Sequence, residues 1–286
     1  MRERSQGKSI LLLLSPALVF IALLFVYPFL NGIYLSLTNS AGNFTLANYA
    51  KFFLDPWELR TIWVTLYISL PITIINVLLA IPMAHYMRSG VKAEKIITFF
   101  LILPITLGVV LLSEGMLTYF GPRGWFNQLL VATHLSSATL ELTHNYIGVV
   151  LSLFFQCFPF GFLMLYGYIS GINPDLEKAA RMLGANKRQI FLKVDLPLMA
   201  PGIAIAFIMN FAMSFSVFPS AVLLGEPSGP TRVMAYAAYE WAFEKFNFNM
   251  GSTISFIMAI IEILFIATAL YIRGRIYRGS SIVGKG

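Results

Sequence analysis

Charged residues are scarce in this chain, and so is cysteine. Lysine, arginine, aspartate and glutamate together make up 12% of the 286 residues, whereas hydrophobic residues make up 58%. So few charges cannot cover the surface of a water-soluble protein of this size, which excludes an ordinary soluble domain. The single cysteine, Cys157, excludes an internal disulfide and any metal site built from several cysteines. Its apolar surroundings in the sequence predict a small core residue.

Motifs for catalysis and nucleotide binding are also missing. The three histidines have no metal-ligand spacing, no glycine-rich phosphate loop of the Walker type occurs, and no pair of nucleophile and base stands out. We therefore expect a non-catalytic chain that binds no metal and no cofactor of its own. Any ATP hydrolysis on which it depends must come from a separate subunit.

What the chain does contain is a series of long apolar runs. Runs of this kind reach the ~20 residues that a helix needs to cross a hydrocarbon core of about 30 Å. They predict an all-α membrane protein with six transmembrane helices at 9–37, 61–86, 96–120, 146–172, 200–224 and 251–272. The intervening segments are short, so residues 1–286 are expected to form one transmembrane domain. The first run follows basic residues, as a secretory signal would, but its length and the lack of a small-residue cleavage site favour a retained helix.

The distribution of basic residues predicts the orientation of these spans. Fifteen of the 20 lysines and arginines lie in segments on the same side as the N-terminus, and the other side holds Lys51, Arg60, Arg123, Arg232 and Lys245. Since lysine and arginine in short loops are retained in the cytoplasm, we expect both termini there. The net charge of +7 then reflects the ends of the spans rather than a surface for nucleic acid.

The longest charged segment on the cytoplasmic side is residues 173–201. Asn173 can cap a helix that begins at Pro174, with acidic residues in its first turn, and Gly184 can end this helix in a left-handed conformation. We expect a short helix, a turn and a second helix. Two alanines provide a low surface that a partner can approach closely, with charged residues around it. The alternative is an amphipathic hairpin that lies on the lipid surface.

This segment resembles the signature of the permease subunits of binding-protein-dependent ABC importers. That signature reads Glu-Ala-Ala, three residues, Gly, nine residues, an aliphatic residue, any residue and Leu-Pro. The chain matches it, between its fourth and fifth spans, at Ala179, Ala180, Gly184, Val194, Leu196 and Pro197. One position departs from the signature, because Lys178 stands where the family has glutamate. Glu177 precedes it and is rotated by about 100° on a helix.

The resemblance implies a type I ABC importer permease in a bacterial inner membrane, forming half of the translocation pathway. In that family the loop 173–201 is a coupling helix that docks on a cytoplasmic ATPase dimer, which binds ATP and Mg²⁺ and switches the pathway between inward-open and outward-open. The coupling residues implied here are Glu177, Lys178, Ala179, Ala180, Arg181, Gly184, Leu196 and Pro197. The other implied partners are a second permease subunit, identical or homologous, and a periplasmic solute-binding protein.

Three local phrases resemble the spermidine/putrescine branch of that family: Leu183 before Gly184, the run Gly229-Pro230-Thr231-Arg232-Val233, and Ala238-Tyr239-Glu240. A polyamine is therefore the first expectation for the substrate. Aminoethylphosphonate, ferric iron, opines and sugars are the alternatives. A secondary transporter or a channel is the competing class, but it needs no docking loop for an ATPase, and no inverted repeat is visible in the sequence.

Ionisable and polar residues inside the spans are candidates for the substrate pathway. Glu114 and Glu262 lie within apolar runs, where a charge is costly unless it faces water or a partner. A carboxylate beside aromatic rings suits a passing amine; alternatively, both glutamates pair with a basic residue of the second permease subunit. The further candidates are Tyr119, Asn210, Phe211, Ser214 and Phe218. The polar row of the fifth span either lines the pore or joins helices through hydrogen bonds.

Overall fold

A computed structural model describes residues 13–136 and 138–276 of the chain. Within these residues every regular element is helical, apart from one isolated bridge between Thr38 and Phe44. Five helices are long and apolar enough to cross a membrane, and a bent pair of helices gives a sixth span if it counts as one. The predicted all-α membrane fold is confirmed. The chain divides into two compact units, Met1–Leu59 with Ala237–Ala259 and Arg60–Tyr236 with Ile260–Gly286.

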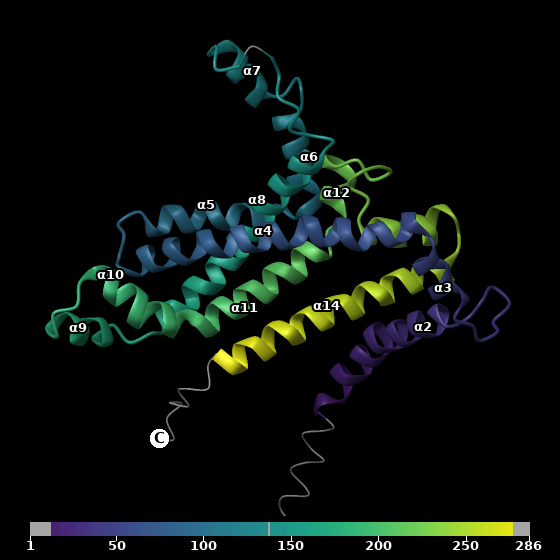
Figure 1. Cartoon of the computed structure of the whole chain (residues 1–286), viewed down its shortest axis with the longest axis horizontal. Coiled ribbons are helices and arrows are strands. Elements are labelled where there is room, and N and C mark those ends of the chain that lie inside the picture. Colours follow the sequence, from purple (N-terminus) through teal and green to yellow (C-terminus); the bar gives the residue numbers. More distant parts are fainter. Residues whose placement is uncertain (1–12, 137, 277–286) are drawn as a thin grey trace, which may run out of the picture. The chain divides into compact units, whose positions relative to one another are not determined.

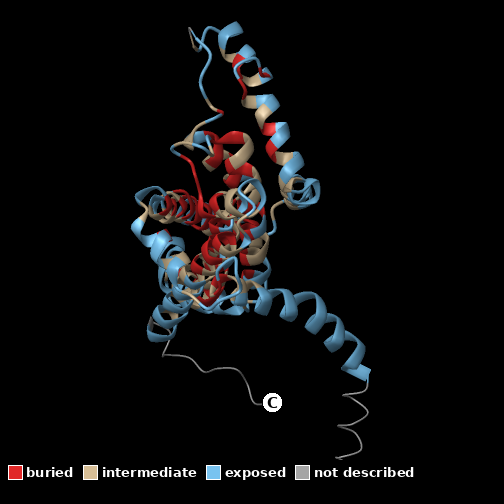
Figure 2. Ribbon diagram, turned by 90° about the vertical axis from the view of Figure 1, so that its right-hand side faces the viewer, coloured by how far each residue is buried: buried red, intermediate tan, exposed pale blue. Residues whose placement is uncertain are grey.

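The first unit contains the N-terminal helix Leu13–Ser36, which includes the π-helical turn η1 (Ala22–Val26) and α2 (Tyr27–Ser36). None of its most apolar stretch is buried by the residues that the structure describes (Figure 2). The helix α3 (Ala47–Leu54), the π-helical turn η3 (Glu240–Glu244) and the start of α14 (Phe248–Ile276) complete the unit. Asn249 of α14 donates hydrogen bonds to the carbonyl oxygens of Leu35 and Thr38 at 3.0 and 2.9 Å, which fixes the end of the N-terminal helix.

The second unit is a helical bundle (Figure 1). Its long helices are α4 (Pro56–Arg88), which starts in the first unit, α8 (Tyr146–Ser170) and α11 (Leu196–Phe215). These three pack together, since one buried cluster contains Ala84 of α4, Leu165 of α8 and Met199 of α11. Cys157 of α8 is fully buried in a second cluster, which confirms the prediction of a small core residue. The remaining transmembrane and connecting helices are α5 (Glu94–Leu107), α6 (Val109–Phe120), α7 (Trp125–Ala132), α12 (Pro219–Leu224) and α13 (Met234–Tyr239).

Two of the expected spans are interrupted. The run 96–120 divides into α5 and α6 at Gly108, whose φ of 74° only glycine adopts readily, and the two helical segments are bent by 105°. The run 200–224 leaves the helical conformation after Phe215, and α12 begins at Pro219. Hydropathy does not reveal such breaks, because glycine and proline are common in transmembrane helices.

The other expected spans agree more closely with the structure. The runs 61–86, 146–172 and 251–272 correspond to α4, α8 and α14, and the run 9–37 corresponds to Leu13–Ser36. The basic residues that precede the first run lie outside the described residues.

Candidate functional site

The segment 173–201 begins with α9 (Asp175–Met182). The side-chain Oδ1 of Asn173 accepts a hydrogen bond from the backbone N–H of Asp175 at 2.9 Å. The helix begins at Asp175, one residue later than the sequence predicts, and Pro174 rather than Asn173 is its N-cap residue. At the other end Gly184 has a φ of 83°, and the N–H of Ala185 donates to the carbonyl of Ala180 at 3.1 Å. This geometry is the left-handed helix stop that the sequence predicts.

The second helix of the hairpin, α10 (Lys187–Ile190), begins with a capping box. The side chain of Asn186 accepts from the N–H of Gln189 at 2.9 Å, and the side chain of Gln189 accepts from the N–H of Asn186 at 2.9 Å. Two backbone donors that a helix start leaves without partners are therefore satisfied. The Asn-x-x-Gln spacing signals this start in the sequence, although we did not select it there.

No break separates α10 from the following span. The helix continues through the π-helical turn η2 (Phe191–Asp195) into α11, so Lys187–Phe215 is one helix. Leu196 and Pro197, the last signature residues, lie inside it. Proline lacks the N–H that would bond back to the preceding turn, which is where the π-helical turn lies. The second arm of the hairpin is therefore continuous with a membrane span.

The helix α9 has an inner and an outer face, and the two signature alanines lie on different ones. Glu177 and Ala180 are partly buried against the chain, whereas Ala179 and Lys178 are exposed. The ammonium group of Lys178 donates to Oδ1 of Asp175 at 2.8 Å, with side chains 72% and 71% exposed. This carboxylate raises the pKa of Lys178 above its ordinary value. The outer face thus carries a paired lysine where the family signature has a free carboxylate.

Two large apolar side chains stand at the end of α9. Met182, the last residue of α9, and Leu183, which follows it, are 90% and 88% exposed, although α9 is mainly polar and charged. Adjacent apolar side chains that none of the described residues covers are typical of a contact surface for another protein. Neither residue was selected as a docking residue from the sequence. The available signal was an apolar pair directly before the helix stop at Gly184.

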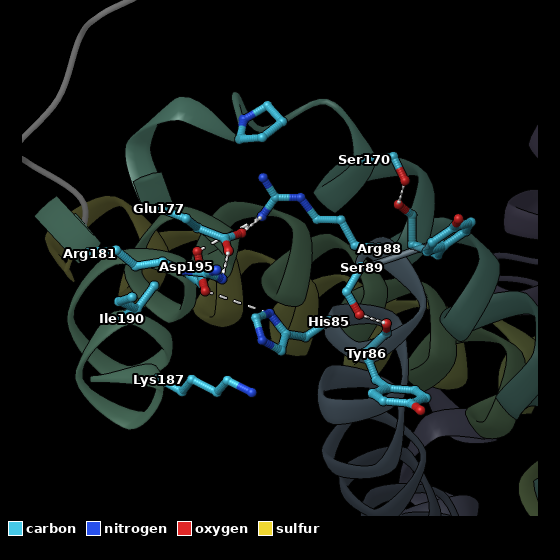
Figure 3. A pocket seen from close by; sticks show the side chains of 12 residues that line it. His85, Tyr86, Arg88, Ser89, Ser170, Glu177, Arg181, Lys187, Ile190 and Asp195 are labelled. Atoms are coloured by element: carbon cyan, nitrogen blue, oxygen red, sulfur yellow. Dashed lines mark hydrogen bonds and ion pairs between the residues drawn. The ribbon is translucent and has the colours of Figure 1, made fainter. Parts of the chain in front are cut away.

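The inner face of α9 borders a pocket of about 680 Å³ (Figure 3). Arg88, the last residue of α4, is its central group. Its Nη1 lies 2.9 Å from Oε1 of Glu177 and 3.9 Å from Oδ1 of Asp195. Its Nη2 donates to the carbonyl oxygen of Ile172 at 2.8 Å. One guanidinium group therefore contacts α9, η2 and the link between α8 and α9.

Asp195 is the most enclosed acid of this pocket, with a side chain that is 1% exposed. Its carboxylate oxygens accept no hydrogen bond from the described residues, and Nδ1 of His85 lies 3.6 Å from Oδ2. A buried carboxylate requires compensating charge, which Arg88 supplies and His85 supplies when protonated. The ring of His85 also packs edge-on against Phe191, with centroids 4.8 Å apart. None of these groups was selected from the sequence, where an aspartate among mostly apolar residues was the available signal.

The pathway candidates on α11 are buried within the chain. Asn210, Phe211 and Ser214 have no exposed surface. Nδ2 of Asn76 on α4 donates to Oδ1 of Asn210 at 3.1 Å, and the hydroxyl of Ser214 donates to the sulfur of Cys157 at 3.6 Å. In this structure the side chains of Asn210 and Ser214 form hydrogen bonds to neighbouring helices.

The remaining pathway candidates lie on other elements. Glu114 and Tyr119 of α6 are exposed, and the ring of Tyr119 packs against that of Phe120 at 4.8 Å. Glu262 of α14 and Phe218, just before α12, are partly buried. No hydrogen bond or ion pair within the described residues joins Glu114 to another candidate. The same residues contain no group of three or more histidine, cysteine, aspartate or glutamate side chains that could hold a metal ion.

The chain is similar in sequence to known transport proteins. The profile of the family described as binding-protein-dependent transport system inner membrane component matches residues 76–279. The spermidine/putrescine transport system permease protein PotB of Haemophilus influenzae is 32% identical over 195 residues, 66% of this chain and 68% of that protein. A probable sulfate transport system permease protein of Prototheca wickerhamii is 26% identical over 179 residues, 63% of this chain and 68% of that protein.

The fold is similar to that of solved transporters. A chain in the crystal structure of a bacterial alginate ABC transporter, in complex with an alginate pentasaccharide-bound periplasmic protein, superposes with a TM-score of 0.84. The two chains are 19% identical, and the superposition covers 98% of each. At this identity the similarity establishes the fold alone.

Proposed function

This chain belongs to the family of binding-protein-dependent transport system inner membrane components, and from this premise we propose that it imports a polyamine such as spermidine or putrescine. It is the permease subunit of an ABC importer, a multi-pass transporter component of the bacterial inner membrane rather than an enzyme. The observation that carries the polyamine proposal is the 32% identity with a spermidine/putrescine permease, against 26% with a sulfate permease.

The charge of the pathway candidates supports a cationic substrate. Polyamines carry positive charge along their length, whereas sulfate is a dianion. Glu114 is an exposed carboxylate of α6, in the bent pair of apolar helices, and the exposed ring of Tyr119 follows five residues later on the same helix. Carboxylates and aromatic faces attract ammonium groups, and a carboxylate repels sulfate. A pathway lined by Glu114 therefore favours an amine.

The substrate is tested by ATP-dependent uptake into proteoliposomes that contain this chain, its second permease subunit, its ATPase and its solute-binding protein. We expect labelled spermidine or putrescine to accumulate. Sulfate, ferric iron, aminoethylphosphonate and a sugar serve as alternative substrates in parallel reactions. Uptake of one of these alternatives without polyamine uptake refutes the polyamine proposal and leaves the family membership untouched.

The second part of the proposal concerns α9, which acts as the coupling helix on the cytoplasmic side. The ATPase dimer, which binds ATP and Mg²⁺, docks on its outer face around Lys178, Ala179, Met182 and Leu183. Two observations support this assignment. Fifteen of 20 basic residues lie on this side of the membrane in the six-span arrangement, and two apolar side chains of α9 and its end are left uncovered. A second permease subunit and a periplasmic solute-binding protein complete the complex.

Cysteine labelling tests both the side of the membrane and the docking. Leu183→Cys is introduced after replacing Cys157 by serine, and Leu135→Cys, 76% exposed in the segment expected on the opposite side, is the matched control. We expect a membrane-impermeant maleimide to label Leu183→Cys only in inside-out vesicles and Leu135→Cys only in intact cells with a permeable outer membrane. Bound ATPase should protect Leu183→Cys from labelling. Labelling of Leu183→Cys from outside, or no protection, contradicts the proposal.

A further inference from the structure

The attachment of α9 to the rest of the chain is mainly polar. This helix has no buried residue, so burial of apolar surface contributes little to holding it in place. Its inner face instead presents Glu177, whose side chain is 21% exposed and lies 2.9 Å from Arg88. Arg181 also approaches Glu177, at 3.5 Å, but from the same helix and with a side chain that is 61% exposed. The pair between Glu177 and Arg88 therefore links α9 to a different helix, α4.

Arg88 is suited to this link because of its shape and position. Its side chain is 10% exposed and reaches Glu177, Asp195 and the carbonyl oxygen of Ile172 at the same time. A guanidinium group has five N–H donors in a fixed plane, so it can serve several acceptors that a lysine ammonium cannot reach together. Figure 3 shows Arg88 extending from the end of α4 toward the carboxylate of Glu177.

Besides Glu177, Arg88 contacts groups on both sides of α9 in the sequence, so the arginine connects α4 to the segments that flank α9. Ile172 follows α8, and Asp195 lies in the helix that continues as α11. His85, one turn before Arg88 on α4, approaches Asp195 at 3.6 Å and reinforces this connection. Farther along the same two helices, Asn76 and Asn210 are joined by a hydrogen bond of 3.1 Å. The helices α4 and α11 are thus connected at two levels.

Resting on the proposed role of α9 as the coupling helix, we infer that Arg88 is a positioning residue that passes displacement of α9 to α4. The covalent chain connects α9 directly to α8 and α11 only. The ion pair from Glu177 to Arg88 adds α4, so three long helices of the bundle respond to ATPase closure together. Without this pair α9 still docks, but its movement reaches α4 only through side-chain packing, and ATP hydrolysis moves less substrate.

The test measures substrate transported per ATP hydrolysed in proteoliposomes of the complete complex. The variants are Arg88→Ala, Glu177→Ala and the double variant, with Arg88→Lys and Glu177→Gln as milder forms. Lys245→Gln, which breaks the ion pair with Glu240 outside the hairpin 173–201, is the matched control. We expect Arg88→Ala and Glu177→Ala each to lower the transport-to-ATP ratio at least about fivefold, the low end of typical coupling between sites. The transport-to-ATP ratio of the double variant should fall no further than that of either single variant, and Lys245→Gln should behave as wild type.

Co-purification of the ATPase separates failure of this inference from failure of the proposed function. If the wild-type chain does not retain the ATPase, the assignment of α9 as a coupling helix fails. If the ATPase stays bound and Arg88→Ala transports as much per ATP as wild type, or if the two single losses multiply in the double variant, the role of Arg88 is refuted. If even Arg88→Lys and Glu177→Gln lose the ATPase, Arg88 maintains the docking surface itself, which also overturns the inference.

Discussion

Substitution of Gly161 by alanine tests the contact between α8 and α11 at one atom. A β-carbon at this position would lie 1.9 Å from Nδ2 of Asn210, far inside van der Waals contact. That nitrogen donates to the carbonyl oxygen of Ala206 at 3.1 Å, and Oδ1 of the same side chain accepts from Asn76 at 3.1 Å. Alanine at 161 must therefore displace a fully buried amide that holds two hydrogen bonds.

The size of the effect follows from these contacts. Each lost hydrogen bond costs roughly 1 kcal/mol, and a buried polar group left without a partner costs about 1–3 kcal/mol. The change from glycine to alanine inside a helix stabilises the folded state by about 1 kcal/mol, because alanine has the higher helix propensity. We therefore expect Gly161→Ala to lower the free energy of unfolding by about 1–3 kcal/mol.

Thermal unfolding of the purified chain in one detergent or nanodisc preparation measures this difference. Gly167→Ala is the matched control, since it lies on the same helix and a β-carbon there meets no atom within 4 Å. It should unfold at or slightly above the wild-type temperature. In an Asn210→Ala background, Gly161→Ala should cause little further loss, because the clashing amide is absent. Equal unfolding temperatures for Gly161→Ala and Gly167→Ala would refute this account of the contact.

Two further predictions concern transport, and a third concerns stability. Gly184→Val removes the residue that tolerates a φ of 83°. We expect normal membrane insertion but loss of uptake and of ATPase stimulation. Normal uptake would count against a coupling role. Glu114→Gln removes the exposed carboxylate of α6 and should raise the KM for spermidine uptake, whereas an unchanged KM eliminates this residue from the pathway. The unfolding temperature of Asp175→Asn should equal that of the wild type from neutral to mildly alkaline pH. The raised pKa of Lys178 keeps its pair with Asp175 fully charged at neutral pH, and the contribution of this pair to stability is lost only as the pH rises through that pKa. Because both side chains are exposed, this contribution is small.

Local signals in the sequence were sufficient for several parts of the structure. Gly184 was expected to end the short helix and does so, and Asn173, which was expected to cap it, bonds to its first residue although Pro174 is the N-cap residue. Each acts through its own backbone and near neighbours, so the information lies within a few residues. The long spans were equally visible, because a bilayer imposes an apolar run of fixed minimum length.

Features that depend on three-dimensional context were not predictable in the same way. The bend at Gly108 leaves the apolar composition of the run unchanged, so hydropathy does not register it. The exposure of Met182 and Leu183 depends on which face of α9 the bundle covers. The contact between Arg88 and Glu177 joins residues that are distant in sequence, and only the packing of α4 beside α9 brings them together. Pairing of this kind leaves no periodic pattern in one sequence.

The left-handed turn at Gly184 also limits how this position can vary in a population. One base change in a glycine codon gives alanine, valine, serine, arginine, cysteine, tryptophan, aspartate or glutamate, but never asparagine, the other residue that suits such a turn. Aspartate tolerates the backbone geometry best among these, yet it places a negative charge next to the negative end of α9. Every single-nucleotide substitution of this codon that changes the amino acid therefore carries either backbone strain or an unfavourable charge.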